Sequence, residues 1–172
     1  MFKQLLTATA MAAALATAAF AVDKPTDPQI AHIAYTAGEI DVAAAKQALK
    51  VSRNAEVRQF AETMERDHTA VNQQALALLK KLNVKPEDND TSKSLSSAAK
   101  AELEKLSKLH GAAFDKAYVD NEVAYHKQVN GALETLLIPS AQNGELKSLL
   151  QTGLKLFKEH QMHAEHLASM VK

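Results

Sequence analysis

Residues 54–82, NAEVRQFAETMERDHTAVNQQALALLKKL, decide the fold. Apolar side chains recur in this segment every three or four residues, the spacing that places them on one face of an α-helix. The apolar positions are Val57, Phe60, Met64, Val71, Ala75, Leu78 and Leu82. Asn54 is a favourable N-cap residue, so we expect a helix over 55–82 that buries one face.

Three other segments have the same apolar period and predict helices over 28–51, 112–136 and 145–171. Asp27 and Pro28 are typical of a helix start, whereas Pro139 and the Asn143-Gly144 pair predict a turn before the last helix. The short break after residue 51 predicts that the first two helices are antiparallel neighbours.

The connection between the second and third long helices spans almost thirty residues. We expect a loop over 83–94 and a short helix over 95–109, long enough together to run back along the bundle. The predicted fold class is therefore all-α, a ferritin-like four-helix bundle with a short extra helix in the crossover. A simple up-down-up-down bundle with a decorated loop is the alternative.

Residues 1–21 have the pattern of a secretory signal peptide. Lys3 precedes a run of apolar and small residues from Leu5 to Phe20, and Ala19-Phe20-Ala21 is typical of a cleavage site. We expect cleavage after Ala21, one bundle domain over 22–172, no membrane span in the mature chain, and export across the inner membrane to the periplasm. A retained membrane anchor is the alternative.

Composition and motifs exclude several classes of function. The chain has no cysteine, which excludes disulfides and thiolate ligands. Lys and Arg together number 20, as do Asp and Glu, so the formal charges balance. The sequence contains no stripe of basic residues, and we therefore predict no nucleic-acid binding. We find neither a glycine-rich phosphate loop nor a common hydrolase motif, and we predict no catalytic residues.

Three histidines interrupt the apolar stripes near the midpoints of three predicted helices, with glutamates close by in the sequence. The candidate metal ligands are His68, His126, His160, Glu39, Glu65 and Glu122. Residues at the midpoints of bundle helices share one layer, and imidazole with carboxylate suits a divalent metal. The alternative interpretation is a buried polar layer that fixes helix register without metal.

Two further histidines, His163 and His166, form an i, i+3 pair beyond His160. We expect this pair nearer the surface, where it can bind a divalent metal weakly.

Several sequence runs, taken in order, resemble a bacterial family of exported, ferritin-like domains, domain of unknown function 4142, often labelled "predicted outer membrane protein". The runs are TAGEI at 36–40, NAEVRQFAETM at 54–64, Asp67-His68-Thr69, GAAFDKAY at 111–118, His126, and Glu159-His160 before Ala164. The resemblance implies a ferritin-like bundle in the bacterial periplasm or envelope and implies no established activity.

These observations favour a non-enzymatic exported bundle that serves envelope stress or binding. The alternative is a divalent-metal-binding protein that uses the mid-bundle histidines and glutamates. The sequence predicts neither a protein partner nor an oligomeric state.

Overall fold

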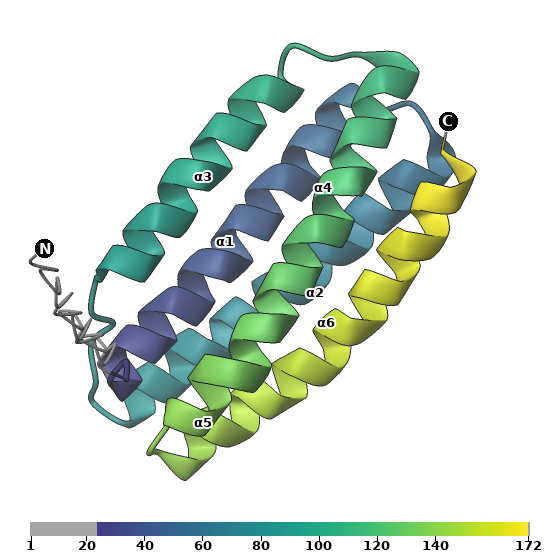
Figure 1. Cartoon of the computed structure of the whole chain (residues 1–172). Helices are drawn as coiled ribbons and strands as arrows, with labels where there is room; N and C mark the ends of the chain where they lie inside the picture. The colour runs from purple at the N-terminus through teal and green to yellow at the C-terminus, as the bar shows by residue number, and fades with distance from the viewer. Residues whose placement is uncertain (1–23, 172) are drawn as a thin grey trace, which may run out of the picture.

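The computed structural model describes residues 24–171, so the predicted signal peptide lies outside the described residues. Helix α1 (Asp27–Val51) and helix α2 (Ala55–Lys81) form an antiparallel pair joined by a three-residue connection (Figure 1). The Asn54 side chain accepts hydrogen bonds from the backbone N–H groups of Glu56 and Val57, which caps α2 as the sequence predicted.

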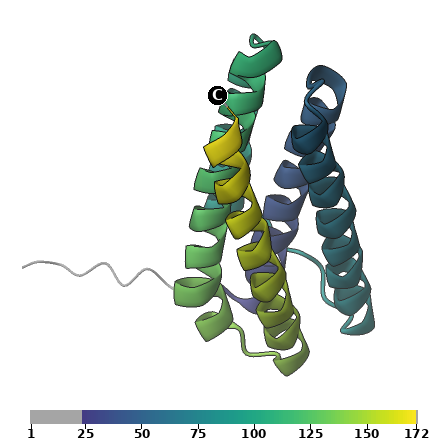
Figure 2. The same ribbon diagram turned by 90° about the vertical axis from the view of Figure 1, so that its right-hand side faces the viewer.

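A second antiparallel pair is formed by α4 (Gly111–Ala132) and α6 (Gly144–Met170). Asn143 caps α6 through bonds to the backbone N–H groups of Glu145 and Leu146. Figure 2 shows the two pairs as two layers, α1 with α2 on one side and α4 with α6 on the other.

Helix α3 (Asp90–Leu106) belongs to the connection from the first helix pair to the second. It runs back along the bundle and packs against α1 (Figure 1). It begins five residues earlier than predicted, so the loop expected over 83–94 is shorter. The cause is a capping box: the Asn89 side chain accepts from the Ser92 N–H, and the Asn89 N–H donates to the Ser92 hydroxyl.

The helix predicted to end at residue 136 continues past that point. A π-helical turn, η1 (Leu133–Leu137), follows α4 and leads into the short α5 (Ile138–Ser140). Pro139 lies within this continuous helical stretch, where it lacks the N–H that a helical hydrogen bond would use. The chain therefore turns after Ser140 instead of before Pro139.

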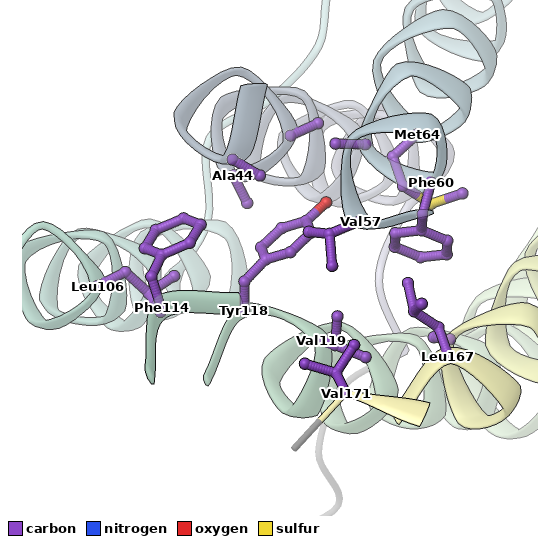
Figure 3. Packing of buried hydrophobic residues seen from close by; sticks show 14 residues of the cluster. Ala44, Val57, Phe60, Met64, Leu106, Phe114, Tyr118, Val119, Leu167 and Val171 are labelled. Atoms are coloured by element: carbon purple, nitrogen blue, oxygen red, sulfur yellow. The ribbon is translucent and has the colours of Figure 1, made fainter. Parts of the chain in front are cut away.

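The core consists of two apolar clusters, one toward each end of the bundle. One includes Phe60, Phe114, Tyr118 and Leu167, whose side chains interdigitate in Figure 3. The other includes Ile30, Leu79, Leu133, Leu150 and Phe157. On each long helix the two clusters are separated by buried polar residues, which form a belt across the middle of the bundle.

Every regular element in the part of the chain that the structure describes is a helix, which confirms the all-α fold class. Within residues 24–171, none of the helices combines the length and hydropathy that a membrane crossing requires.

Candidate metal centre

The polar belt brings five ionisable side chains from four helices together, and none is more than 4% exposed. They are Asp41 on α1, His68 on α2, Glu122 and His126 on α4, and His160 on α6. Isolated charged groups are costly to bury, so such a cluster needs internal partners or a cation.

The three imidazoles converge. One ring nitrogen from each of His68, His126 and His160 lies within 4.8 Å of the other two. Asp41 Oδ2 is 3.3 Å from His68 Nε2 and 3.5 Å from His126 Nε2. Two nitrogen ligands of a tetrahedral zinc ion are about 3.3 Å apart, because each lies 2.0–2.1 Å from the metal. Small side-chain rotations therefore suffice to bring these atoms around one ion.

The structure defines the tautomer of His126. Its Nδ1 lies 3.0 Å from the backbone carbonyl oxygen of Glu122. A carbonyl oxygen only accepts hydrogen bonds, so Nδ1 carries the proton and Nε2 carries the lone pair. Nε2 is buried and has no hydrogen-bond partner. This is the state in which a histidine can bind a metal.

His160 is oriented by a carboxylate on the neighbouring layer. Its Nε2 lies 3.0 Å from Asp67 Oδ2, and Arg66 Nε donates to Asp67 Oδ1 over 2.7 Å. Because Asp67 accepts from Nε2–H, neutral His160 keeps its lone pair on Nδ1, which is buried and has no partner. Metal-binding histidines usually have such a carboxylate or carbonyl on their other nitrogen.

His68 is held by packing instead of hydrogen bonds. Its ring stacks on Phe157 with centroids 4.5 Å apart and planes 7° from parallel. Neither ring nitrogen has a hydrogen-bond partner, although Nε2 is close to Asp41. The stacking fixes the plane of the imidazole and leaves both nitrogens available.

Burial changes the protonation of the cluster. It raises the pKa of Asp41 to about 8 and the pKa of Glu122 well above its usual value, where proximity to Asp41 adds to the effect. It lowers the pKa of His126 to about 4 and the pKa of His68 well below its usual value. Near neutral pH the Asp41–histidine contacts therefore join neutral groups instead of forming ion pairs.

Asp67, which lies beside the cluster, and His160 are affected by their mutual hydrogen bond as well as by burial. Burial acts to raise the pKa of Asp67, but the hydrogen bonds from Arg66 and His160 outweigh it and hold that pKa below its usual value. Burial lowers the pKa of His160, while the bond to Asp67 opposes that shift. Asp67 is therefore the ionised carboxylate beside the cluster.

Four of the sequence-predicted candidates lie together in the cluster: His68, His126, His160 and Glu122. Both carboxylate oxygens of Glu122 are buried without a hydrogen-bond partner, and Oε2 is 3.6 Å from His126 Nδ1.

The other predicted glutamates lie outside the cluster. Glu39 is exposed and accepts a 2.8 Å hydrogen bond from Asn72 Nδ2. Glu65 is partly exposed and lies 3.8 Å from Lys46 Nζ. The spacing Glu65-x-x-His68 therefore does not bring both side chains to one site.

The expected surface pair is exposed, with His163 packing edge-on against Phe60 at 5.1 Å. Among the described residues, neither His163 nor His166 joins a group of three possible ligands.

Sequence reasoning missed Asp41, the carboxylate at the centre of the cluster, and the contact of Asp67 with His160. Glu39 lies at the midpoint of α1 and Asp41 only two residues beyond it, so depth along the helix favoured the wrong carboxylate.

The family model described as "Domain of unknown function (DUF4142)" matches residues 9–167. The chain belongs to this family. The resemblance seen in the sequence is thereby confirmed.

A solved structure shares the fold of this DUF4142 chain: the "putative secreted protein DUF305 from Streptomyces coelicolor". The two are 14% identical with a TM-score of 0.72, and the similarity covers 84% of this chain and 92% of the other. At this identity the likeness concerns the fold alone. No curated protein matches the chain.

Proposed function

We propose that this DUF4142 protein binds one divalent transition-metal ion in the middle of its bundle. The ligands are His68, His126, His160 and Asp41. The observation that carries the proposal is the convergence of three buried imidazole nitrogens from three helices, with the Asp41 carboxylate 3.3 and 3.5 Å from two of the histidines.

The hydrogen bonds around the histidines support a metal site over a metal-free polar layer. His126 and His160 each use one nitrogen to bond an acceptor outside the cluster and keep the other without a partner. A layer that only fixed helix register would be expected to satisfy its buried polar atoms internally.

The charge of the cluster also suits a divalent ion. Burial opposes the ionisation of Asp41 and Glu122, so a positive charge that replaces their protons would favour the carboxylate forms near neutral pH. One divalent ion would balance both carboxylates and leave the centre neutral. Three imidazoles and a carboxylate match four-coordinate zinc, and the same donors also bind copper, nickel and iron.

We place this binding function in an exported, ferritin-like protein. Two antiparallel helix pairs joined by a crossover helix support the ferritin-like arrangement. The signal-peptide pattern of residues 1–21 supports export to the periplasm. We infer metal binding without catalysis, because four protein ligands fill the coordination sphere of the ion.

The test is a competition titration of untagged, metal-free protein with Zn²⁺ and a chromophoric chelator. We expect one ion per chain, and at least a 100-fold weaker affinity in His126→Ala and in Asp41→Ala. His166→Ala is the matched control, because His166 is exposed on the same helix as His160. Equal Zn²⁺ affinity in all four proteins, or no Zn²⁺ binding by the parent, would contradict the proposed site and support a polar layer without metal.

A further inference from the structure

A cavity of about 130 Å³ lies between the two helix pairs, next to the polar belt. Its walls come from α1, α2, α4, η1 and α6, with α3 along one side. Asp41, His68 and His126 form its inner end. The cavity therefore shares Asp41, His68 and His126 with the candidate metal centre, and its other walls lie outside that centre.

Apart from that inner end, the walls are mostly apolar. Large side chains that line the cavity include Ile33, Val71, Leu133, Leu137, Leu150 and Phe157, and alanines fill much of the rest. An apolar protein cavity of about 150 Å³ stays dry and binds benzene. The space beside the belt is thus suited to a body the size of one aromatic ring.

The cavity reaches the surface between α3 and α4. Thr91 at the start of α3 and Gln128 on α4 both line it, and both are exposed. These exposed lining residues place the outer end of the cavity on this side of the bundle.

The inner end offers hydrogen-bonding atoms that the protein leaves unpaired. Both carboxyl oxygens of Asp41 and the Nε2 atoms of His68 and His126 are buried without hydrogen-bond partners. A hydroxyl group at this end would meet both acceptors and a donor, whereas a charged group would lose its hydration in an apolar chamber.

We propose that this cavity binds a compact uncharged molecule with an apolar body the size of one aromatic ring and a single hydroxyl group directed at Asp41 and His68. The hydroxyl would use atoms that the metal would occupy, so this binding belongs to the metal-free protein. The cavity and the unpaired atoms belong to the protein itself, so the metal-free protein is competent.

Phenol is the probe, titrated into metal-free protein and followed by methyl chemical shifts in NMR spectra. We expect saturable shifts confined to methyl groups that line the cavity, such as those of Val71 and Leu150. Benzene should bind at least threefold more weakly than phenol, and benzoate should not saturate. Benzene binding as tightly as phenol would contradict the role of the hydroxyl, and saturable benzoate binding would contradict the requirement for an uncharged ligand.

Ala75→Leu fills the cavity from α2 and should weaken phenol binding at least tenfold. Ala77→Leu, two residues away and exposed, is the matched control and should bind as the parent does. Ala34→Leu fills the cavity from α1 and replaces Ala75→Leu in this experiment if Ala75→Leu does not fold. Phenol shifts that persist in the filled variant, or that spread over the surface, would overturn the proposal. Failure of the metal titration would leave this experiment unaffected.

Discussion

Asp67 Oδ2 on α2 lies 3.0 Å from His160 Nε2 on α6, and this contact joins the two helix pairs at the level of the polar belt. Asp67 also accepts a hydrogen bond from Arg66, which keeps its pKa low and its carboxylate ionised despite partial burial. The ionised carboxylate holds the proton of His160 on Nε2 and leaves the Nδ1 lone pair for a ligand.

Asp67→Asn should therefore weaken Zn²⁺ binding about 10- to 100-fold, which is the usual effect of removing the hydrogen-bond partner of a metal-binding histidine. All four proposed ligands remain in this variant, so binding should weaken without a change in stoichiometry. Chelator competition measures the affinity. Asp120→Asn, which alters an exposed carboxylate paired with Lys116, should bind as the parent does. Unchanged affinity in Asp67→Asn would mean that the contact does not support a metal ligand.

The metal-free protein should lose stability between pH 6.5 and pH 8. The pKa of Asp41 is raised to about 8, so the folded state holds a proton that the unfolded state releases, and this stabilisation is lost as pH rises from about 4 to 8. The lowered pKa of His126, about 4, acts in the opposite direction, but only below its unfolded value of 6.5. Above pH 6.5 the loss from Asp41, which faces His68 on α2 and His126 and Glu122 on α4, should be roughly 1–2 kcal/mol.

Urea unfolding of chelator-treated protein at several pH values measures this loss. Asp41→Asn should weaken the dependence and leave the part that comes from Glu122, whose pKa burial also raises, whereas Asp120→Asn should keep all of it. Zn²⁺ should reverse the trend, because the ion binds the deprotonated carboxylate and its affinity rises with pH. A metal-free parent that gains stability from pH 6.5 to 8 would show that Asp41 is ionised in the folded protein.

Gly38→Ala should destabilise the fold by about 1–3 kcal/mol, the usual cost of overpacking. A Cβ at this position would lie 2.2 Å from Asn72 Oδ1, and Asn72 is buried and bonded to Glu39. Thermal unfolding of metal-free protein measures the effect. Gly131→Ala is the control: its Cβ meets nothing within 4 Å, so that helical position should be stabilised by about 0.5–1 kcal/mol. Equal melting temperatures for the two variants would contradict the close approach of α1 and α2.

The exported chain should begin at Val22. Cleavage after Ala21 follows from the Ala19-Phe20-Ala21 pattern at the end of the apolar run. Intact-mass spectrometry of protein recovered from the periplasm gives the mature N-terminus. A full-length chain in that fraction, or one retained in the membrane, would favour the anchor alternative.

The sequence predicted the four long helices because their periodic apolar residues and their caps agree. Asn54 caps α2 as expected, and Asn143, which was predicted only as part of a turn, caps α6. The start of α3 was missed because its capping box uses Asn89 and Ser92 within a segment rich in turn-forming residues. The turn-forming residues of this segment suggested a loop, but the reciprocal hydrogen bonds between Asn89 and Ser92 start a helix there.

The histidines were predictable from the sequence because each interrupts a clear apolar stripe. The acidic partner was not predictable in the same way. Helix α1 carries alanines on several faces, so its buried side is poorly marked, and Glu39 was chosen where the structure buries Asp41. The contact between Asp67 and His160 depends on how α2 packs against α6, and no single-helix pattern contains that information.

Zinc K-edge X-ray absorption of the one-to-one complex identifies the atoms that surround the ion. We expect four nitrogen or oxygen ligands at about 2.0–2.1 Å, with the multiple scattering of about three imidazole rings. A zinc ion surrounded mainly by water, or a complex with no more than one imidazole, would contradict a metal centre built from His68, His126 and His160.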